Sequence, residues 1–317
     1  MANDNQAPFP VQPELTAIAI AYRNAAYTLI GDLVMPRVTP PLAVKAFKWF
    51  EHNLADGYSI PDTAVGRLGR PAEVSWSGVE KEGACKDYGL DEPVPQDDID
   101  QSRGTPFNPL GGAVERTTNL VILDRERRVA GITFDAANYE AANVQTLVGT
   151  DQFSDYVNSD PVGVLSEMLD GTIVRANYLT MGQTVWSKLK LHPKIIKAIY
   201  PTGNGAGIIT RQQMAELLEV KEIRVGESRV NVSRKGQAAN LARTWGSHIA
   251  GHFQDPSATH QGGVTWGLTL QYGTKVAGSR PDGNIGLRGG QRVRSGESVA
   301  ELVLAKAAGF LLVNAVA

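Results

Sequence analysis

The clearest pattern of apolar and polar positions lies between residues 160 and 200. Asp160 can cap a helix that Pro161 opens at its first position, and the apolar residues that follow recur at helical spacing. Gly171 ends that helix, and the short apolar run at 178–181 is typical of a buried strand. This part of the chain is therefore predicted to form a helix and strand of an α/β core.

Two further helices are predicted after this strand. The sequence from Thr180 to Gln183 fits a capping box, which would begin one helix directly after the strand. His192 and Pro193 then begin a second helix, whose buried side is supplied by three isoleucines.

The longest predicted helix runs from about residue 108 to residue 136. Gly111 and Gly112 weaken its first turn, whereas Asp124 and Arg128 have the spacing of a stabilising ion pair. It would extend about 43 Å at 1.5 Å per residue, well beyond the average helix of about 11–12 residues. A helix of this length predicts an elongated subunit.

The N-terminal region is predicted to hold a polar arm at 1–14 and one amphipathic helix at 15–33, ended by three prolines. Alternating positions farther on predict a hairpin across 74–88, with its turn at 80–83. Residues 47–103 contain too few apolar positions to bury a core. This excursion must therefore lie on something else, such as a neighbouring molecule.

The C-terminal half is predicted to be mostly strands. One helix is expected at 214–220, and a glycine- and arginine-rich segment at 273–296. The predicted strands are 223–225, 230–232, 245–253, 264–272, 299–304 and 308–317.

Composition narrows the classes of function. The chain has 317 residues, 42% hydrophobic and 20% charged, with a net charge of −2. A protein that grips nucleic acid over a broad surface would be basic, so broad DNA binding is not expected. The single cysteine, Cys85, excludes an internal disulfide and a cysteine-based zinc site. No apolar run approaches about 18 residues, and no signal peptide is recognisable, so a cytosolic origin is expected.

Candidate chemistry is sparse. The glycine loop at 203–207 lacks the lysine of a phosphate-binding loop. His248, His252 and His260 are the only histidine cluster, but they lack the glutamate of an HExxH site, and the local pattern favours a strand. Residues four apart on a strand lie about 13 Å apart. A metal-dependent hydrolase using His248 and His252 is kept as a low alternative, and no catalytic site, cofactor or metal is predicted.

Several short motifs resemble one family. They are Ser-Asp-Pro at 159–161, Met-Gly at 181–182, His-Pro at 192–193, the segment at 29–50 and the terminal strand GFLLVNAV at 309–316. In these motifs and in their order along the chain, the sequence resembles tailed-phage major capsid proteins of the Hong Kong 97 fold, in the lambda-like and Mu-like group.

The resemblance implies an α+β fold with named parts. These are an N-terminal arm at 1–46, an extended hairpin loop at 47–106, a peripheral domain with a spine helix at 107–160 and 265–306, and an axial domain at 161–264 and 307–317.

The implied function is structural. Hexamers and pentamers of the chain would form an icosahedral head shell that encloses double-stranded DNA without sequence-specific binding, assembled in the host cytoplasm and located in the virion. The expected partners are the chain itself, a portal and a decoration protein, with no membrane. A separate scaffolding protein is expected because the first predicted helix begins near Met1, and the alternative is that the sequence is that of a mature, processed form. An encapsulin-type nanocompartment shell is the alternative within this fold.

Two segments of opposite charge are candidates for contacts between subunits. The acidic side chains are Asp87, Asp91, Glu92, Asp97, Asp98 and Asp100, and the basic ones are Arg280, Arg288, Arg292 and Arg294. The resemblance places the acidic loop away from the arginine-rich tip within one subunit and across a neighbour, where opposite charge would select a docking register. Two separately solvated loops are the open alternative.

Overall fold

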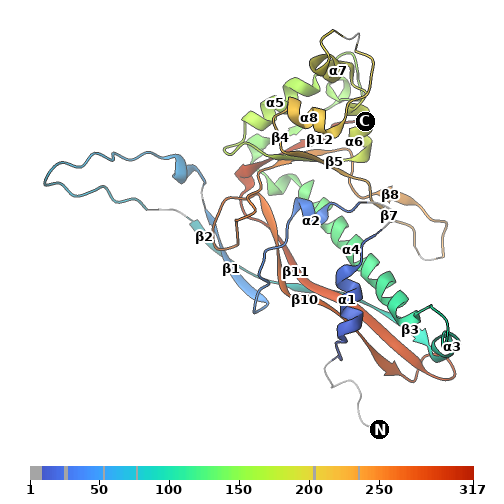
Figure 1. The fold of residues 1–317 in the computed structure, drawn as a ribbon. Coiled ribbons are helices and arrows are strands. Elements are labelled where there is room, and N and C mark those ends of the chain that lie inside the picture. Colours follow the sequence, from blue (N-terminus) through green and yellow to red (C-terminus); the bar gives the residue numbers. More distant parts are fainter. Residues whose placement is uncertain (1–8, 25–27, 53, 76–77, 203–204, 235) are drawn as a thin grey trace.

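The computed structural model describes residues 9–24, 28–52, 54–75, 78–202, 205–234 and 236–317 (Figure 1). A long helix, α4 (Pro109–Thr133), runs between a three-stranded sheet and a five-stranded sheet. Its 25 residues confirm the predicted long helix. Gly111 and Gly112 do not delay its start, because the Asn108 side chain accepts a hydrogen bond of 3.1 Å from the Gly111 amide and Pro109 occupies the first turn.

The three-stranded sheet is antiparallel, in the order β10 (Gly267–Asp282), β11 (Gly290–Val303) and β3 (Lys86–Pro95). The glycine- and arginine-rich segment 273–296 is therefore the distal half of a long hairpin rather than a loop. A short helix, α3 (Gln96–Gln101), follows β3 at the hairpin's far end.

The predicted single helix at 15–33 is wrong, because the structure has two shorter helices there. These are α1 (Pro13–Ala21) and α2 (Gly31–Val34); position 25 of the predicted stripe lies outside the described residues. Helix α1 packs on the sheet through Leu15 and Ala19, in an apolar cluster with α4. The chain after α2 runs along the edge of β10, where the Val38 amide donates to the Thr269 carbonyl at 2.9 Å.

The five-stranded sheet has the order β4 (Val144–Thr146), β12 (Gly309–Val313), β9 (Ile249–His252), β5 (Tyr178–Gly182) and β6 (Glu222–Gly226). Helices α5 (Pro161–Asp170), α6 (Gln183–Leu189), α7 (Pro193–Ile199) and α8 (Arg211–Leu217) accompany it and share its apolar cluster. The helix–strand–helix–helix prediction is confirmed. The capping box is wrong: Thr180 lies inside β5, and Gly182 precedes α6 without a side-chain cap.

Smaller elements complete the fold. Strands β7 (Arg229–Asn231) and β8 (Leu241–Arg243) pair as a hairpin, and five short 3-10 helices connect the larger elements in the part of the chain that the structure describes. The 3-10 helices are Leu54–Tyr58, Ala136–Asn138, Ala141–Asn143, Gly149–Asp151 and Lys306–Ala308. Strand β4 and the buried Phe153, which fall in the predicted peripheral range 107–160, belong to the five-stranded body.

The excursion is a hairpin of β1 (Ala46–His52) and β2 (Gly78–Ala84), which extends away from the body (Figure 1). The predicted turn at 80–83 is wrong, because these residues lie within β2. Strand β3, which begins at Lys86 inside the predicted loop range 47–106, belongs to the three-stranded sheet. Cys85 lies between β2 and β3, at the boundary between the excursion and the three-stranded sheet. It is 5% exposed and packs in an apolar cluster that contains Phe47 and Leu270, which anchors this boundary to the body.

Candidate assembly surfaces and the junction network

The acidic and arginine-rich segments lie side by side within one subunit. Strand β3 pairs along β11, and Asp91 lies opposite Arg294 in the register. The Arg294 guanidinium donates two hydrogen bonds, of 2.6 and 2.8 Å, to the Asp91 carboxylate. These bonds lower the pKa of Asp91 and raise the pKa of Arg294. The prediction that these two segments lie apart in one subunit is therefore wrong.

Most of the other charged candidates also have partners inside the subunit. The pairs are Arg292 with Asp282 at 2.7 Å, Arg288 with Asp97 at 3.2 Å, Arg116 with Glu92 at 2.9 Å, Lys45 with Asp87 at 2.6 Å, and Arg103 with Asp100 at 2.9 Å. Within the described ranges, Asp98 and Arg280 are the two candidates without an ion pair. The opposite charges of the segments are thus explained without a neighbour, and their role between subunits stays a prediction.

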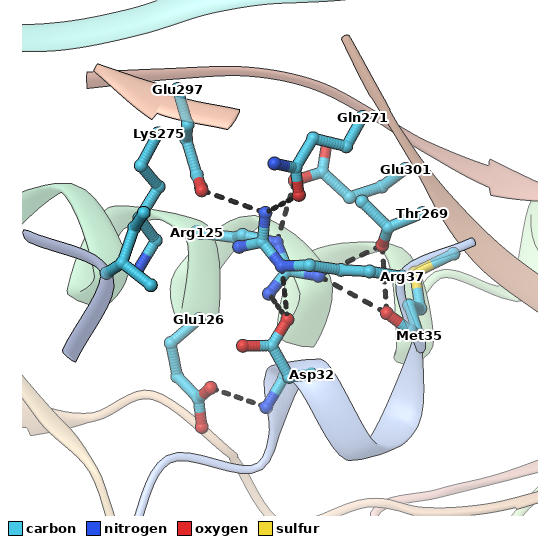
Figure 2. Close-up of polar contacts among 12 residues, drawn as sticks. Asp32, Met35, Arg37, Arg125, Glu126, Thr269, Gln271, Lys275, Glu297 and Glu301 are labelled. Atoms are coloured by element: carbon cyan, nitrogen blue, oxygen red, sulfur yellow. Dashed lines mark hydrogen bonds and ion pairs between the residues drawn. The ribbon is translucent and has the colours of Figure 1, made fainter. Parts of the chain in front are cut away.

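A network of buried polar side chains surrounds residues 30–37, which we call the junction segment (Figure 2). Glu126 of α4 accepts hydrogen bonds from the backbone amides of Ile30 at 2.9 Å and Gly31 at 2.6 Å. The indole nitrogen of Trp245 donates a third, at 2.7 Å. Burial raises the pKa of Glu126, although the three donors favour its carboxylate form.

Arg125 connects the same helix to the junction segment and to β10. It is 2% exposed and forms an ion pair with Asp32. Its guanidinium also donates to the Met35 carbonyl at 3.2 Å and to the Thr269 hydroxyl at 3.0 Å. These contacts anchor both ends of α2 to α4, because Asp32 lies within that helix and Met35 follows its last residue.

Arg37 extends the network to the sheet face. Its guanidinium contacts Asp32 at 2.9 Å, Gln271 of β10 at 2.8 Å and Glu297 of β11 at 2.9 Å (Figure 2). Glu297 is 4% exposed, so Arg37 neutralises a buried carboxylate.

The five-stranded body holds the junction segment from another side. Arg224 of β6 donates to the Leu33 carbonyl at 2.5 Å and to the Gln254 side chain at 2.8 Å. Gln254 in turn donates to the carbonyls of Leu33, at 3.1 Å, and Val34, at 2.5 Å. The junction segment is therefore bonded to both sheets and to the long helix.

Sequence reasoning missed this network, although one signal was present. Arg125 lies four residues from both Val121 and Val129, on the buried stripe of α4. A charged residue within an apolar helical stripe indicates a buried partner. The partners named above are at least 90 residues away along the chain, so spacing could not identify them.

His248 and His252 lie in different surroundings. His252 is fully buried, and its ring is tilted by 43° relative to that of Trp266, with the ring centroids 4.2 Å apart. Its Nε2 lies 3.3 Å from the Tyr139 hydroxyl. His248 instead accepts from the Asn314 amide at 3.0 Å. Among the residues that the structure describes, no three histidine, cysteine or acidic side chains gather as metal ligands. The predicted glycine loop at 203–207 lies partly outside the described residues.

The loop of the excursion is exposed to solvent along its whole described length from residue 59 to residue 75. Every residue at 59–75 is exposed, including apolar Ile60 and Leu68, each 92% exposed. Nothing within the described part of the subunit covers these side chains.

None of the described helices has the length and apolarity needed to cross a bilayer.

Comparison with known proteins decides the family. No family model matches the chain. It is 48% identical over 313 residues, 99% of both chains, to the major capsid protein of Pseudomonas phage JBD67. The chain belongs to the phage major capsid proteins. It is also 26% identical over 243 residues, 75% of each chain, to the major capsid protein of Burkholderia phage BcepMu.

Solved structures agree on the fold of this capsid protein. A phage-related protein from Bordetella bronchiseptica RB50 has a TM-score of 0.73 at 22% identity, with 98% of this chain and 99% of that chain covered. A chain of the cyanophage P-SCSP1u capsid has a TM-score of 0.57 at 10% identity, with 92% and 90% covered. The α+β, Hong Kong 97 fold is thus confirmed, and the capsid protein is a shell-forming structural subunit that associates with itself.

Proposed function

We propose that this capsid protein forms hexamers and pentamers of an icosahedral head that encloses double-stranded DNA without sequence-specific binding. The observation that carries the proposal is the excursion, whose residues at 59–75 are all exposed. An isolated two-stranded hairpin is only marginally stable in water, so β1, β2 and their loop gain from lying on a neighbour. The net charge of −2 suits enclosure of DNA better than adhesion to it.

The remaining partners belong to the same proposal. Assembly would take place in the host cytoplasm, with a separate scaffolding protein, a portal at one vertex and a decoration protein on the finished shell. The three-stranded sheet with α4 would be the peripheral domain, and the five-stranded body the axial domain. The excursion would be the extended loop, with the shorter bounds given by β1 and β2.

An encapsulin-type shell is the second candidate, because encapsulins share the fold. The 48% identity to a phage capsid protein along 99% of the chain favours the phage head. The hydrolase alternative has less support, since His252 is fully buried against Trp266.

The test is expression of the full chain with and without the scaffolding protein of its phage, followed by electron microscopy of the purified particles. Closed icosahedral shells are expected, and virions should carry the chain around nuclease-protected DNA. A variant in which a short Gly-Ser linker replaces residues 59–75 should keep the circular dichroism of the subunit and form no shells. A monomer at high concentration with scaffold present would contradict the proposal, and shells filled with an enzyme would favour the encapsulin.

A further inference from the structure

The turn between β10 and β11 buries one apolar side chain and exposes another to solvent. Ile285 is 8% exposed and packs beneath the turn, whereas Leu287 is 99% exposed. Gly286, at φ 61°, and Gly289, at φ 75°, adopt the left-handed conformation that this tight turn requires. Leu287 is thus a projecting apolar side chain with no packing role in its own subunit.

The turn is anchored to α3, which fixes where Leu287 projects. The Gln96 amide donates to the Gly289 carbonyl at 3.0 Å, and Arg288 contacts Asp97 at 3.2 Å. These contacts tie the hairpin tip to the short helix beside it (Figure 1). Leu287 is therefore presented by a braced tip, which lowers the entropy lost when it docks.

A cavity of about 300 Å³ lies at the same end of the molecule, between the end of β3, α3 and the start of α4. Its apolar lining comes from Pro93, Val94, Pro95 and Phe107, and Phe107 is 61% exposed. Asp98 contributes to the lining and has no ion-pair partner within the described residues. The cavity therefore combines an apolar surface with an unpaired negative charge.

We propose that Leu287 of one copy docks in this cavity of a second copy, with Arg288 beside Asp98. The proposal rests on the self-assembly given under Proposed function. A second copy is the occupant because the turn carries the matching chemistry, an apolar side chain next to a positive charge. The subunit's own Leu287 remains 99% exposed and cannot be the occupant. The projecting side chain and the cavity are different surfaces of the same tip, so the contact is heterologous: each copy offers Leu287 to one neighbour and its cavity to another.

Substitution at the projection is the first test. Leu287→Asp places a negative charge against the acidic cavity and is expected to lower the assembled fraction about tenfold or more, whereas Leu287→Met should assemble normally. Subunit folding should be unchanged in both, since Leu287 packs on nothing. Normal assembly of Leu287→Asp would overturn the proposal.

Cross-linking supplies a test that does not depend on loss of assembly. Leu287→Cys and Gln101→Cys are made as separate variants, since Gln101 is exposed and lines the cavity, and the native Cys85 is buried. Mixed subunits are assembled, oxidised and run on a non-reducing gel. A disulfide dimer of the two variants, present in shells and absent from unassembled subunits, is expected.

The controls separate this proposal from the proposed function. Each variant alone should give no dimer through these positions. Shells that form without the mixed dimer, or in which Leu287→Cys is linked to a scaffolding or decoration protein instead, would overturn the docking while leaving the capsid function intact. Failure of the unsubstituted chain to assemble with scaffold would instead count against the proposed function.

Discussion

Trp245 and Glu126 are joined by a hydrogen bond of 2.7 Å between the indole nitrogen and the carboxylate. The bond links the five-stranded body to the long helix, and the same carboxylate holds the amides of Ile30 and Gly31. One buried side chain therefore fixes three segments that are distant in sequence. This contact therefore helps to fix the placement of the five-stranded body relative to the long helix.

Substitution of Glu126 by glutamine is expected to destabilise the unassembled subunit by about 1–3 kcal/mol. The amide nitrogen of glutamine cannot accept a hydrogen bond, so at least one of the three buried donors loses its acceptor. Urea denaturation of unassembled subunits at neutral pH measures the change in the free energy of unfolding. Glu115→Gln, an exposed substitution on the same helix, is the matched control and should change stability by less than about 0.5 kcal/mol. Equal effects of the two substitutions would show that the carboxylate of Glu126 is dispensable.

The ion pair of Asp91 and Arg294 predicts a modest stability term that acid removes. Arg294 lowers the pKa of Asp91 below 3.8, so the folded state favours the ionised carboxylate. The contribution is present above pH 3.8 and is lost as the pH falls through the lower folded pKa. Asp91→Asn should therefore cost about 0.5–1 kcal/mol at pH 7 and progressively less below pH 3.8.

Chemical denaturation across this pH range tests the prediction. Asp151→Asn, at an exposed position away from this pair, should cost little at any pH. A deficit for Asp91→Asn that stays constant down to pH 2 would contradict the assigned role of the carboxylate.

His252 predicts a second pH dependence, at less acidic values. Burial lowers the pKa of His252 from 6.5 to about 3, with a further contribution from the nearby Arg224. Between these values the unfolded chain binds a proton that the folded chain excludes, so stability falls with decreasing pH by up to about 1.4 kcal/mol per unit. His252→Gln should lower stability at pH 7 but flatten its decline between pH 6.5 and 3. His248→Gln should flatten the decline less, since His248 is only partly buried, and an unchanged slope for His252→Gln would refute the prediction.

The exposed loop of the excursion predicts a difference in proteolysis between subunits and shells. Trypsin should cleave unassembled subunits after Arg67, whereas the bond after Arg70 is protected by Pro71. If the loop lies on a neighbour, assembled shells should be cleaved at least about tenfold more slowly. The Arg67→Gln variant identifies the band that comes from this site. Equal cleavage rates in both forms would mean that the loop stays uncovered after assembly.

The parts of the fold that sequence predicts well are those whose signals are local. The core segment from Asp160 to Tyr200 was predicted element by element, because its proline, glycine and histidine markers lie next to the residues they control. The long helix was predicted from periodicity in the same way. Its buried Arg125 was not interpreted, because its partners Asp32 and Thr269 lie 93 and 144 residues away.

The errors in the hairpin and in the charged segments have one physical cause. Alternation within 74–88 suggested that consecutive runs pair with each other, but β2 pairs with β1 and β3 pairs with β11. A period-2 pattern shows which residues share one face of a strand, but it does not identify the strand with which it pairs. Once β3 is placed beside β11, the acidic residues meet the arginines of their own chain. Asp98 alone among the acidic candidates remains for a neighbour.

The junction segment is synthesised long before several of the residues that bind it. Residues 30–37 leave the ribosome early, but Arg224, Gln254 and Glu297, which bind them, are made much later. At about 5–20 residues per second, the 260 residues between Arg37 and Glu297 take roughly 13–52 s to translate. Until then the two sheets cannot be locked together. The complete set of junction contacts can therefore form only when the polypeptide is nearly finished.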